Sequence, residues 1–173
     1  MRADREREYV AYVEASMVRL RRTAYHLSGN WHAAEDLVQE TLAKLYQHWN
    51  RVRDVEALDG YVRKMLYRTF LAQTKRAWYR RILLTTEPPD APAPGAREPD
   101  DRLDLMAALA RLPAGQRAVV TLRYLERLDV NETARVLGRS PGTVKSQTAN
   151  ALANLRALLP GYRDEPRRAE AKG

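Results

Sequence analysis

The chain has 173 residues, of which 45% are hydrophobic, so it is long enough to bury a core in one domain or in two small ones. Its 30 Lys and Arg residues against 22 Asp and Glu give a formal net charge of +8, which favours a polyanionic partner. The absence of cysteine excludes disulfide frameworks, thiolate zinc sites and cysteine nucleophiles. The charged start and the lack of a long apolar run lead us to expect no signal peptide, no transmembrane helix and a cytoplasmic location.

The N-terminal part of the chain carries two apolar stripes with helical spacing. The first covers residues 9–27 and stops near Gly29, and the second covers residues 34–49. Apolar residues that recur every three or four positions place one face of a helix against a core, and a glycine between polar residues separates two helices. No comparable segment alternates with the period of two that indicates a strand. We therefore expect an all-α protein that begins with two antiparallel helices.

A proline-rich segment, LTTEPPDAPAPGAREPDDR, divides the chain. Each proline removes a backbone donor and biases the preceding residue away from the helical conformation. The segment is also acidic, which makes it a poor ligand for phosphate. We interpret it as a semi-extended linker. The expected organisation is a helical domain at residues 1–83, the linker at 84–102, a second helical domain at 103–160 and a charged tail at 161–173.

A helix-turn-helix is predicted in the second domain, in the stretch LDVNETARVLGRSPGTVKSQ. Asp129 is expected to cap a short helix at residues 130–137, with Glu132 completing a capping box. Gly138 fits the left-handed position that ends a helix, because it has no Cβ atom. The Ser-Pro pair that follows fits the N-cap and the first position of a second helix.

The second helix of this motif presents short polar side chains, and no acid, on the face opposite its apolar stripe. A recognition helix needs such donors and acceptors at base edges, with flanking cations on phosphate. An ordinary αα-hairpin with a solvated face is the alternative, but it does not explain the capping box, the glycine turn, the Ser-Pro start and the acid-free face together. The predicted DNA-contacting residues are Arg139, Ser140, Thr143, Lys145, Ser146, Gln147 and Asn150.

Two motifs carry a family resemblance. The stretch LPAGQRAVVTLRYLERLDVNETARVLGRSPGTVKSQTANALANLR resembles the −35-reading domain of bacterial sigma factors of the extracytoplasmic-function group. The stretch LSGNWHAAEDLVQETLAKLYQHW resembles the other domain of that group, which docks on RNA polymerase and opens the −10 element. The resemblance spans residues 9–159 and implies a non-enzymatic protein that binds core RNA polymerase, at the largest-subunit clamp helices and the flap, and directs it to promoter DNA. An anti-sigma factor is a further candidate partner, and the nucleoid is the implied location.

The second predicted helix carries the candidate docking surface, an acidic and amide-rich face in a basic protein. By resemblance, this surface binds the clamp helices of the largest polymerase subunit. A solvated helix exterior is the alternative, because most such charge runs have no partner. The expected polymerase-binding residues are Asp36, Leu37, Gln39, Glu40 and Gln47.

Residues 60–81 contain seven Lys and Arg residues and no acid, with aromatic residues between them. Cations can follow a phosphate backbone while aromatic rings stack on unpaired bases, which is the chemistry of single-strand capture. Phe70 belongs to an apolar stripe and is expected in the core. By resemblance, a flipped −10 base is captured near residues 67–69, where Arg68 stands at the position of the family's usual Asn. The expected −10 contacts are Arg63, Lys64, Tyr67, Arg68, Thr69, Lys75, Arg76, Trp78, Arg80 and Arg81.

The main functional alternative is a helix-turn-helix repressor or activator that acts without polymerase, which would not need the acidic docking surface. An enzyme is a third class, but the chain has no Gly-rich phosphate loop, zinc-protease motif or serine elbow. His32, Glu35 and Asp36 lack a second ligand cluster, so no metal and no cofactor is expected. Relatives usually carry Arg where this chain has Gln147 and Asn150, and the amides favour adenines in the −35 element.

Overall fold

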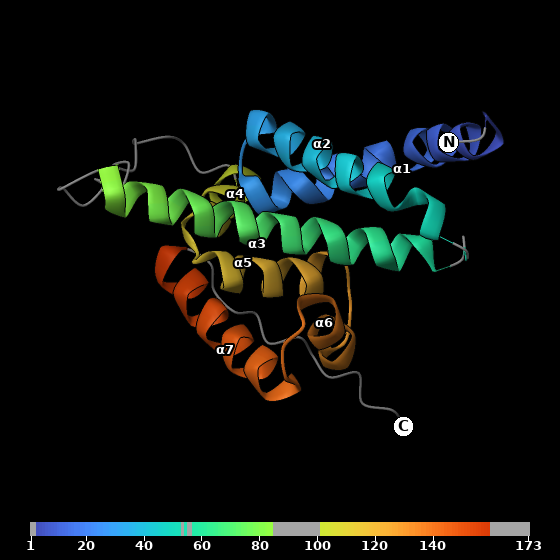
Figure 1. The fold of residues 1–173 in the computed structure, drawn as a ribbon. Coiled ribbons are helices and arrows are strands. Elements are labelled where there is room, and N and C mark those ends of the chain that lie inside the picture. The colour runs from blue at the N-terminus through green and yellow to red at the C-terminus, as the bar shows by residue number, and fades with distance from the viewer. Residues whose placement is uncertain (1–2, 53, 55–56, 85–100, 160–173) are drawn as a thin grey trace, which may run out of the picture.

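The computed structural model describes residues 3–52, 54, 57–84 and 101–159 (Figure 1). Within these ranges every regular element is a helix, which confirms the all-α prediction. Of the predicted linker, residues 85–100 lie outside the described part, as does the predicted tail. The ends of that linker are helical, because Leu84 closes one helix and Asp101 opens the next.

The first two helices form as their apolar stripes predict. α1 (Ala3–Ser28) ends at Gly29, whose φ of 79° is a left-handed conformation that glycine adopts without steric cost. Asn30 caps α2 (Trp31–His48), since its side chain accepts a 2.8 Å hydrogen bond from the backbone N–H of Ala33. A single 3-10 turn, η1 (Trp49–Arg51), follows α2.

The long helix α3 (Leu58–Leu84) lies in the middle of the molecule. Figure 1 shows the α1–α2 pair on one side of α3 and α5, α6 and α7 on the other side, while α4 lies behind α3 and packs against α1. Asp59 ties the start of α3 to α1, because it accepts a 3.1 Å hydrogen bond from the Tyr12 hydroxyl and pairs with Arg19. The second half consists of α4 (Asp101–Arg111), α5 (Ala114–Val120), the π-helical turn η2 (Thr121–Leu125), α6 (Val130–Leu137) and α7 (Pro141–Leu158).

The apolar core extends across both halves of the chain. The sequence predicts two helical domains, and one small cluster fits that division by joining α4, α5 and α7 around Leu109, Leu112 and Leu155. The larger cluster does not, because buried residues of α1, α2 and α3 share it with residues from the second half. These six residues are Ala118, Val119, Leu122, Ala134, Leu137 and Val144. Residues beyond the linker therefore complete the core of the first helices.

Candidate DNA and polymerase interfaces

The helix-turn-helix forms through the local contacts predicted for it. The Asp129 carboxylate accepts a 2.8 Å hydrogen bond from the Glu132 N–H, and the Glu132 carboxylate accepts one of the same length from the Asp129 N–H. This reciprocal capping box starts α6, and Gly138, with φ of 65°, ends it in the left-handed conformation. Ser140 caps α7 by accepting a 3.1 Å bond from the Thr143 N–H. The predicted motif and its helix bounds are confirmed.

α7 presents the predicted recognition residues beside the turn. Ser140, Thr143, Lys145, Ser146 and Asn150 are exposed, whereas Arg139 and Gln147 are half-buried. The Arg139 guanidinium donates to the Gln147 side-chain oxygen, so these two residues hold each other on the inner edge of the surface. The opposite face of α7 is anchored by three buried residues, Val144, Ala151 and Leu155.

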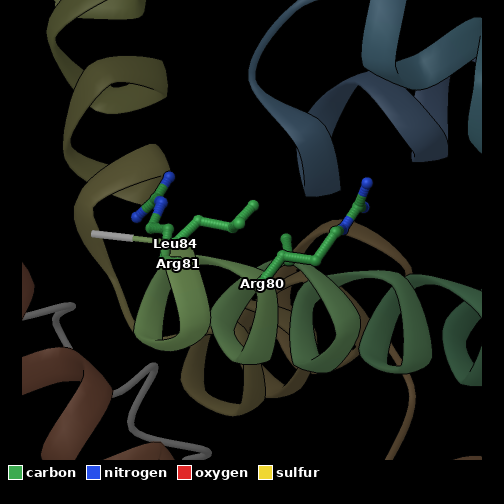
Figure 2. A pocket seen from close by; sticks show the side chains of 4 residues that line it. Arg80, Arg81 and Leu84 are labelled. Carbon is green, nitrogen blue, oxygen red and sulfur yellow. The ribbon is translucent and has the colours of Figure 1, made fainter.

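The basic surface of α3 splits into two parts. Toward the C-terminal end its side chains are exposed, and Trp78 and Tyr79 meet edge to face with ring centroids 5.1 Å apart. Figure 2 shows Arg80 and Arg81 projecting from the last turns of α3, where they line a shallow pocket with Leu84. The exposed members of the predicted −10 set are Arg68, Lys75, Arg76, Trp78, Arg80 and Arg81.

The other part of the α3 surface lies against the second half of the protein. Tyr67 is fully buried, and its hydroxyl donates a 2.8 Å hydrogen bond to Glu126. Arg63 is half-buried and forms an ion pair of 2.5 Å with the same carboxylate. Burial raises the pKa of the Tyr67 hydroxyl well above its usual value, and the Glu126 carboxylate raises it further. Thr69 is also buried and accepts a 3.1 Å bond from Lys44. In this conformation Tyr67 and Thr69 are core residues and cannot contact a nucleic acid.

The predicted docking surface on α2 also divides by burial. Asp36, Gln39 and Gln47 are exposed, as a contact surface requires. Leu37 has no exposed area and belongs to the core, because it lies on the apolar stripe of the same helix. Leu37 can therefore stabilise the helix that carries this surface, but it cannot itself contact a partner.

Glu40 joins α2 to α3. Its carboxylate accepts hydrogen bonds from Lys44 at 2.7 Å, from Gln73 at 2.6 Å and from Arg76 at 3.0 Å. Burial raises the pKa of Glu40, but these three hydrogen bonds outweigh burial and lower the pKa to about 2. Glu40 is thus an ionised link within the fold as well as a predicted polymerase contact.

Sequence reasoning missed two residues that hold the halves together. Glu126, next to η2, is the acid that binds Arg63 and Tyr67, and nothing in its sequence neighbourhood distinguishes it from a solvated glutamate. Arg117 donates to three carbonyl groups, including that of Leu27 at 2.7 Å. Burial lowers its pKa. A cation directly before three buried apolar residues of α5 is a signal that could have identified Arg117.

Two family matches cover most of the chain. Residues 12–80 match sigma-70 region 2, and residues 102–155 match sigma-70 region 4. The RNA polymerase sigma-E factor of Streptomyces coelicolor is 37% identical over 157 residues, which cover 88% of this chain and 86% of that protein. The ECF sigma factor SigL of Mycobacterium tuberculosis is 31% identical over 80% of this chain and 81% of its own length. The chain belongs to the extracytoplasmic-function group of the sigma-70 family.

Two solved structures resemble this sigma factor. The sigma factor RpoE of Bartonella quintana, crystallised with the anti-sigma factor NepR, aligns with a TM-score of 0.69 at 25% identity and covers 90% of this chain and 99% of its own. CnrH, in complex with the cytosolic domain of CnrY, shares the fold with a TM-score of 0.59 at 21% identity. The family directs RNA polymerase to promoters and points to a non-enzymatic regulator, so a repressor that acts without polymerase is not favoured.

Two further functional features are absent from the described residues. No described helix is long and apolar enough to cross a membrane. Among the described residues, no three His, Asp or Glu side chains gather closely enough to hold a metal ion.

Proposed function

We propose that this sigma factor reads the −35 element with α7, captures the melted −10 strand with the cationic and aromatic face of α3, and docks on core RNA polymerase through the exposed face of α2. One observation carries the proposal: a correctly capped helix-turn-helix with an acid-free outer face lies in one chain with a sigma region 2. We expect it to act at the nucleoid.

The −35 contact follows from the side chains that α7 exposes. Asn150 stands one turn beyond Ser146, and both side chains are exposed together with Lys145. An amide forms its paired hydrogen bonds best with N6 and N7 of adenine, whereas a lysine holds phosphate. We therefore propose that the −35 element contains adenines opposite the amides.

The proposed docking surface has fewer exposed side chains than the sequence predicts. Asp36, Gln39 and Gln47 supply its exposed side chains, and the Asp36 side chain is 67% exposed. The clamp helices of the largest polymerase subunit are the proposed partner, with the flap as the proposed partner of the second half. The anti-sigma factor NepR bound to RpoE supports a third partner of that class for this chain.

In vitro transcription tests the function directly. Core polymerase alone and core polymerase with this protein are compared on a promoter library, with transcripts mapped at their 5′ ends. Promoter-specific transcripts only in the presence of the protein are the expected result. Sequence-specific duplex binding without any polymerase-dependent transcript would instead support a repressor or activator.

A further inference from the structure

The first turn of α5 lies against the helix-turn-helix. α5 packs beside α7 (Figure 1), and the Asn154 side chain of α7 donates a 2.8 Å hydrogen bond to the Gln116 side chain of α5. One residue earlier, Gly115 faces two of the predicted DNA-contacting residues. A Cβ atom at Gly115 would stand 3.1 Å from Nη1 of Arg139 and 3.3 Å from Nε2 of Gln147. These two side chains therefore occupy the space where any other residue at position 115 would place its own side chain.

The conformation of the backbone does not require a glycine at position 115. Among the described glycines, Gly29 and Gly138 have the positive φ angles that favour this residue, whereas Gly115 lies within α5. A glycine destabilises a helix relative to alanine, because it loses more conformational freedom on folding. The structural consequence of Gly115 is therefore the space that its missing Cβ atom leaves for Arg139 and Gln147.

Arg139 and Gln147 form a hydrogen bond that leaves the arginine charged. The guanidinium donates to the side-chain oxygen of Gln147. An arginine has five N–H donors, so a bond to one amide oxygen leaves donors for a phosphate group. The amide is neutral, whereas a carboxylate in its place would cancel the charge that attracts phosphate. The pair therefore holds a full positive charge in one orientation.

The position of Arg139 suits a contact with the DNA backbone. It directly precedes Ser140, the N-cap of α7, and Thr143 and Lys145 are exposed in the first turns of that helix. A free arginine side chain loses rotamer entropy when it binds a ligand. Arg139 is half-buried and already hydrogen-bonded without DNA, so part of this loss occurs when the protein folds. Such preorganisation strengthens a contact without adding a new one.

We propose that Gly115 is a positioning residue for the −35 contact. Because it has no side chain, it leaves room for the Arg139–Gln147 pair, and the pair orients the Arg139 guanidinium toward a DNA phosphate. This inference rests on the proposed −35 role of α7. It extends the unit that sets −35 affinity to α5, a helix in which the sequence predicts no DNA-contacting residue. Gly115 acts through Arg139 and not on the DNA itself.

Titration of a −35 duplex tests this role. A fluorescent duplex with the −35 element mapped from the transcription experiment is titrated with the full chain at two salt concentrations. Gly115→Leu fills the space and should displace the pair. We expect it to weaken duplex binding on the order of tenfold, as for the loss of one hydrogen bond to a charged group. It should also lower the salt slope by about one, as Arg139→Ala should. Gly115→Ala adds only a Cβ atom and should cause smaller changes in the same direction.

Two comparisons separate positioning from a loss of stability. Gly60→Leu makes the same change in α3, where a Cβ atom would have open space within 4 Å, and should leave duplex binding unchanged. Gly115→Ala should be at least as stable as the unmodified protein in urea denaturation, because alanine favours a helix and the displaced groups are flexible side-chain ends. Lower affinity in a variant that is no less stable cannot result from unfolding. If Gly115→Leu unfolds, Gly115→Ala decides.

A double-mutant cycle shows whether Gly115 acts through Arg139. Gly115→Leu should add little to the loss caused by Arg139→Ala, because the guanidinium that it displaces is then absent. Additive losses would overturn the inference, as would an unchanged affinity and salt slope for both Gly115 variants. These outcomes leave the proposed function intact. An unmodified chain that does not prefer the −35 duplex to a scrambled duplex would instead contradict the proposed function, and this inference with it.

Discussion

Glu40 shows why sequence alone cannot separate a predicted polymerase contact from a link within the fold. A carboxylate on an acidic helix face looks like part of a docking surface, yet here it receives hydrogen bonds from Lys44, Gln73 and Arg76. A charge reversal at Glu40 would place a third cation between Lys44 and Arg76 and loosen α2 from α3. Loss of polymerase binding in such a variant would therefore reflect the fold as much as the interface.

The ionised state of Glu40 predicts a pH-dependent contribution to stability. Its folded-state pKa is lowered from 4.5 to about 2, so its stabilisation is present above pH 4.5 and is lost as the pH falls toward 2. Glu40→Gln should lower the free energy of unfolding at neutral pH by on the order of 2 kcal/mol, allowing for partial solvent screening. Urea titrations between pH 2 and pH 7 should show this difference vanishing at the acid end. Asp104→Asn, at an exposed acid, is the control, and a pH-independent difference for Glu40→Gln would contradict the assignment.

The proposed docking surface is better tested at exposed residues that do not link α2 to α3. Asp36→Lys combined with Gln39→Lys changes two exposed positions of α2 and leaves the Glu40 link intact. We expect this pair to reduce co-purification with core polymerase by at least about tenfold, since reversed charge at an interface opposes association. Glu14→Lys with Ala11→Lys makes the same charge change on exposed positions of α1 and is the matched control. Undiminished co-purification would exclude this face of α2 from the interface.

The two amides of α7 should behave differently because their surroundings differ. Asn150 is exposed, whereas the Gln147 oxygen is already bound by Arg139. Asn150→Ala should relax discrimination at one base pair by roughly 1–3 kcal/mol. Gln147→Ala also frees Arg139, so its loss of specificity should come with altered phosphate contact. Titration of single-base −35 variants at two salt concentrations measures both effects.

Lys145→Ala is the comparison for the amide variants. It should weaken all duplexes about equally and lower the salt slope by about one, as expected for a phosphate contact. Uniform loss across the set for Asn150→Ala would mean that this residue positions α7, and that specificity comes from Thr143, Ser146 or DNA shape.

At the scale of elements, the start of α6 offers a clean stability test. The Asp129 carboxylate satisfies one of the backbone donors that every helix start leaves without an intrahelical partner. Asp129→Ala should lower the free energy of unfolding by about 1 kcal/mol, the usual cost of losing an N-cap. Asp129→Ser retains a capping oxygen and should recover most of the loss in urea denaturation. A neutral Asp129→Ala would show that packing of α6 on α3, rather than its cap, fixes where the helix begins.

The helices could be predicted because their signals are local. Three such signals are the glycine at the end of α1, the capping box of α6 and the Ser-Pro start of α7. Each depends only on residues a few positions away, so a short stretch of sequence is enough to predict it. The shared core could not be predicted in this way. Leu122 is equally apolar whether it packs against its own domain or against α3. Only the assembled fold determines which of these cores it joins.

Local signals also explain which of the predicted site residues are exposed in the structure. Exposed positions of α7 follow from a helical period and one capped end. Tyr67 has the sequence context of an accessible aromatic in a cationic helix, yet it is buried and its hydroxyl donates to Glu126, 59 positions away in the sequence. A local sequence pattern does not reveal long-range partners of this kind. Composition therefore predicted a −10 face on α3, but not which of its side chains are exposed.

At the scale of the whole molecule, the described structure is one packed body formed by two family regions. Region 4 contributes six residues to the core of region 2, while its own cluster around Leu109 and Leu155 holds α4, α5 and α7 together. A region with its own core can leave its neighbour without unfolding. In this packed form the predicted −35 side chains of α7 remain exposed, whereas Arg63 and Tyr67 of α3 lie against region 4.

Limited proteolysis tests this organisation in one experiment. We expect the first cut within residues 84–102, because this proline-rich segment lies between two helical regions and cannot form a helix along its length. The packed core, the Arg117 bond to the Leu27 carbonyl and the Glu126 bridge should then keep the two fragments together. Size-exclusion chromatography with mass spectrometry should find both in one peak at the size of the uncut chain, and Glu126→Lys should shift them toward separate peaks. A first cut within residues 35–49 would contradict the domain boundary, and fragments that separate at once in the unmodified protein would show that the two regions do not hold each other in solution.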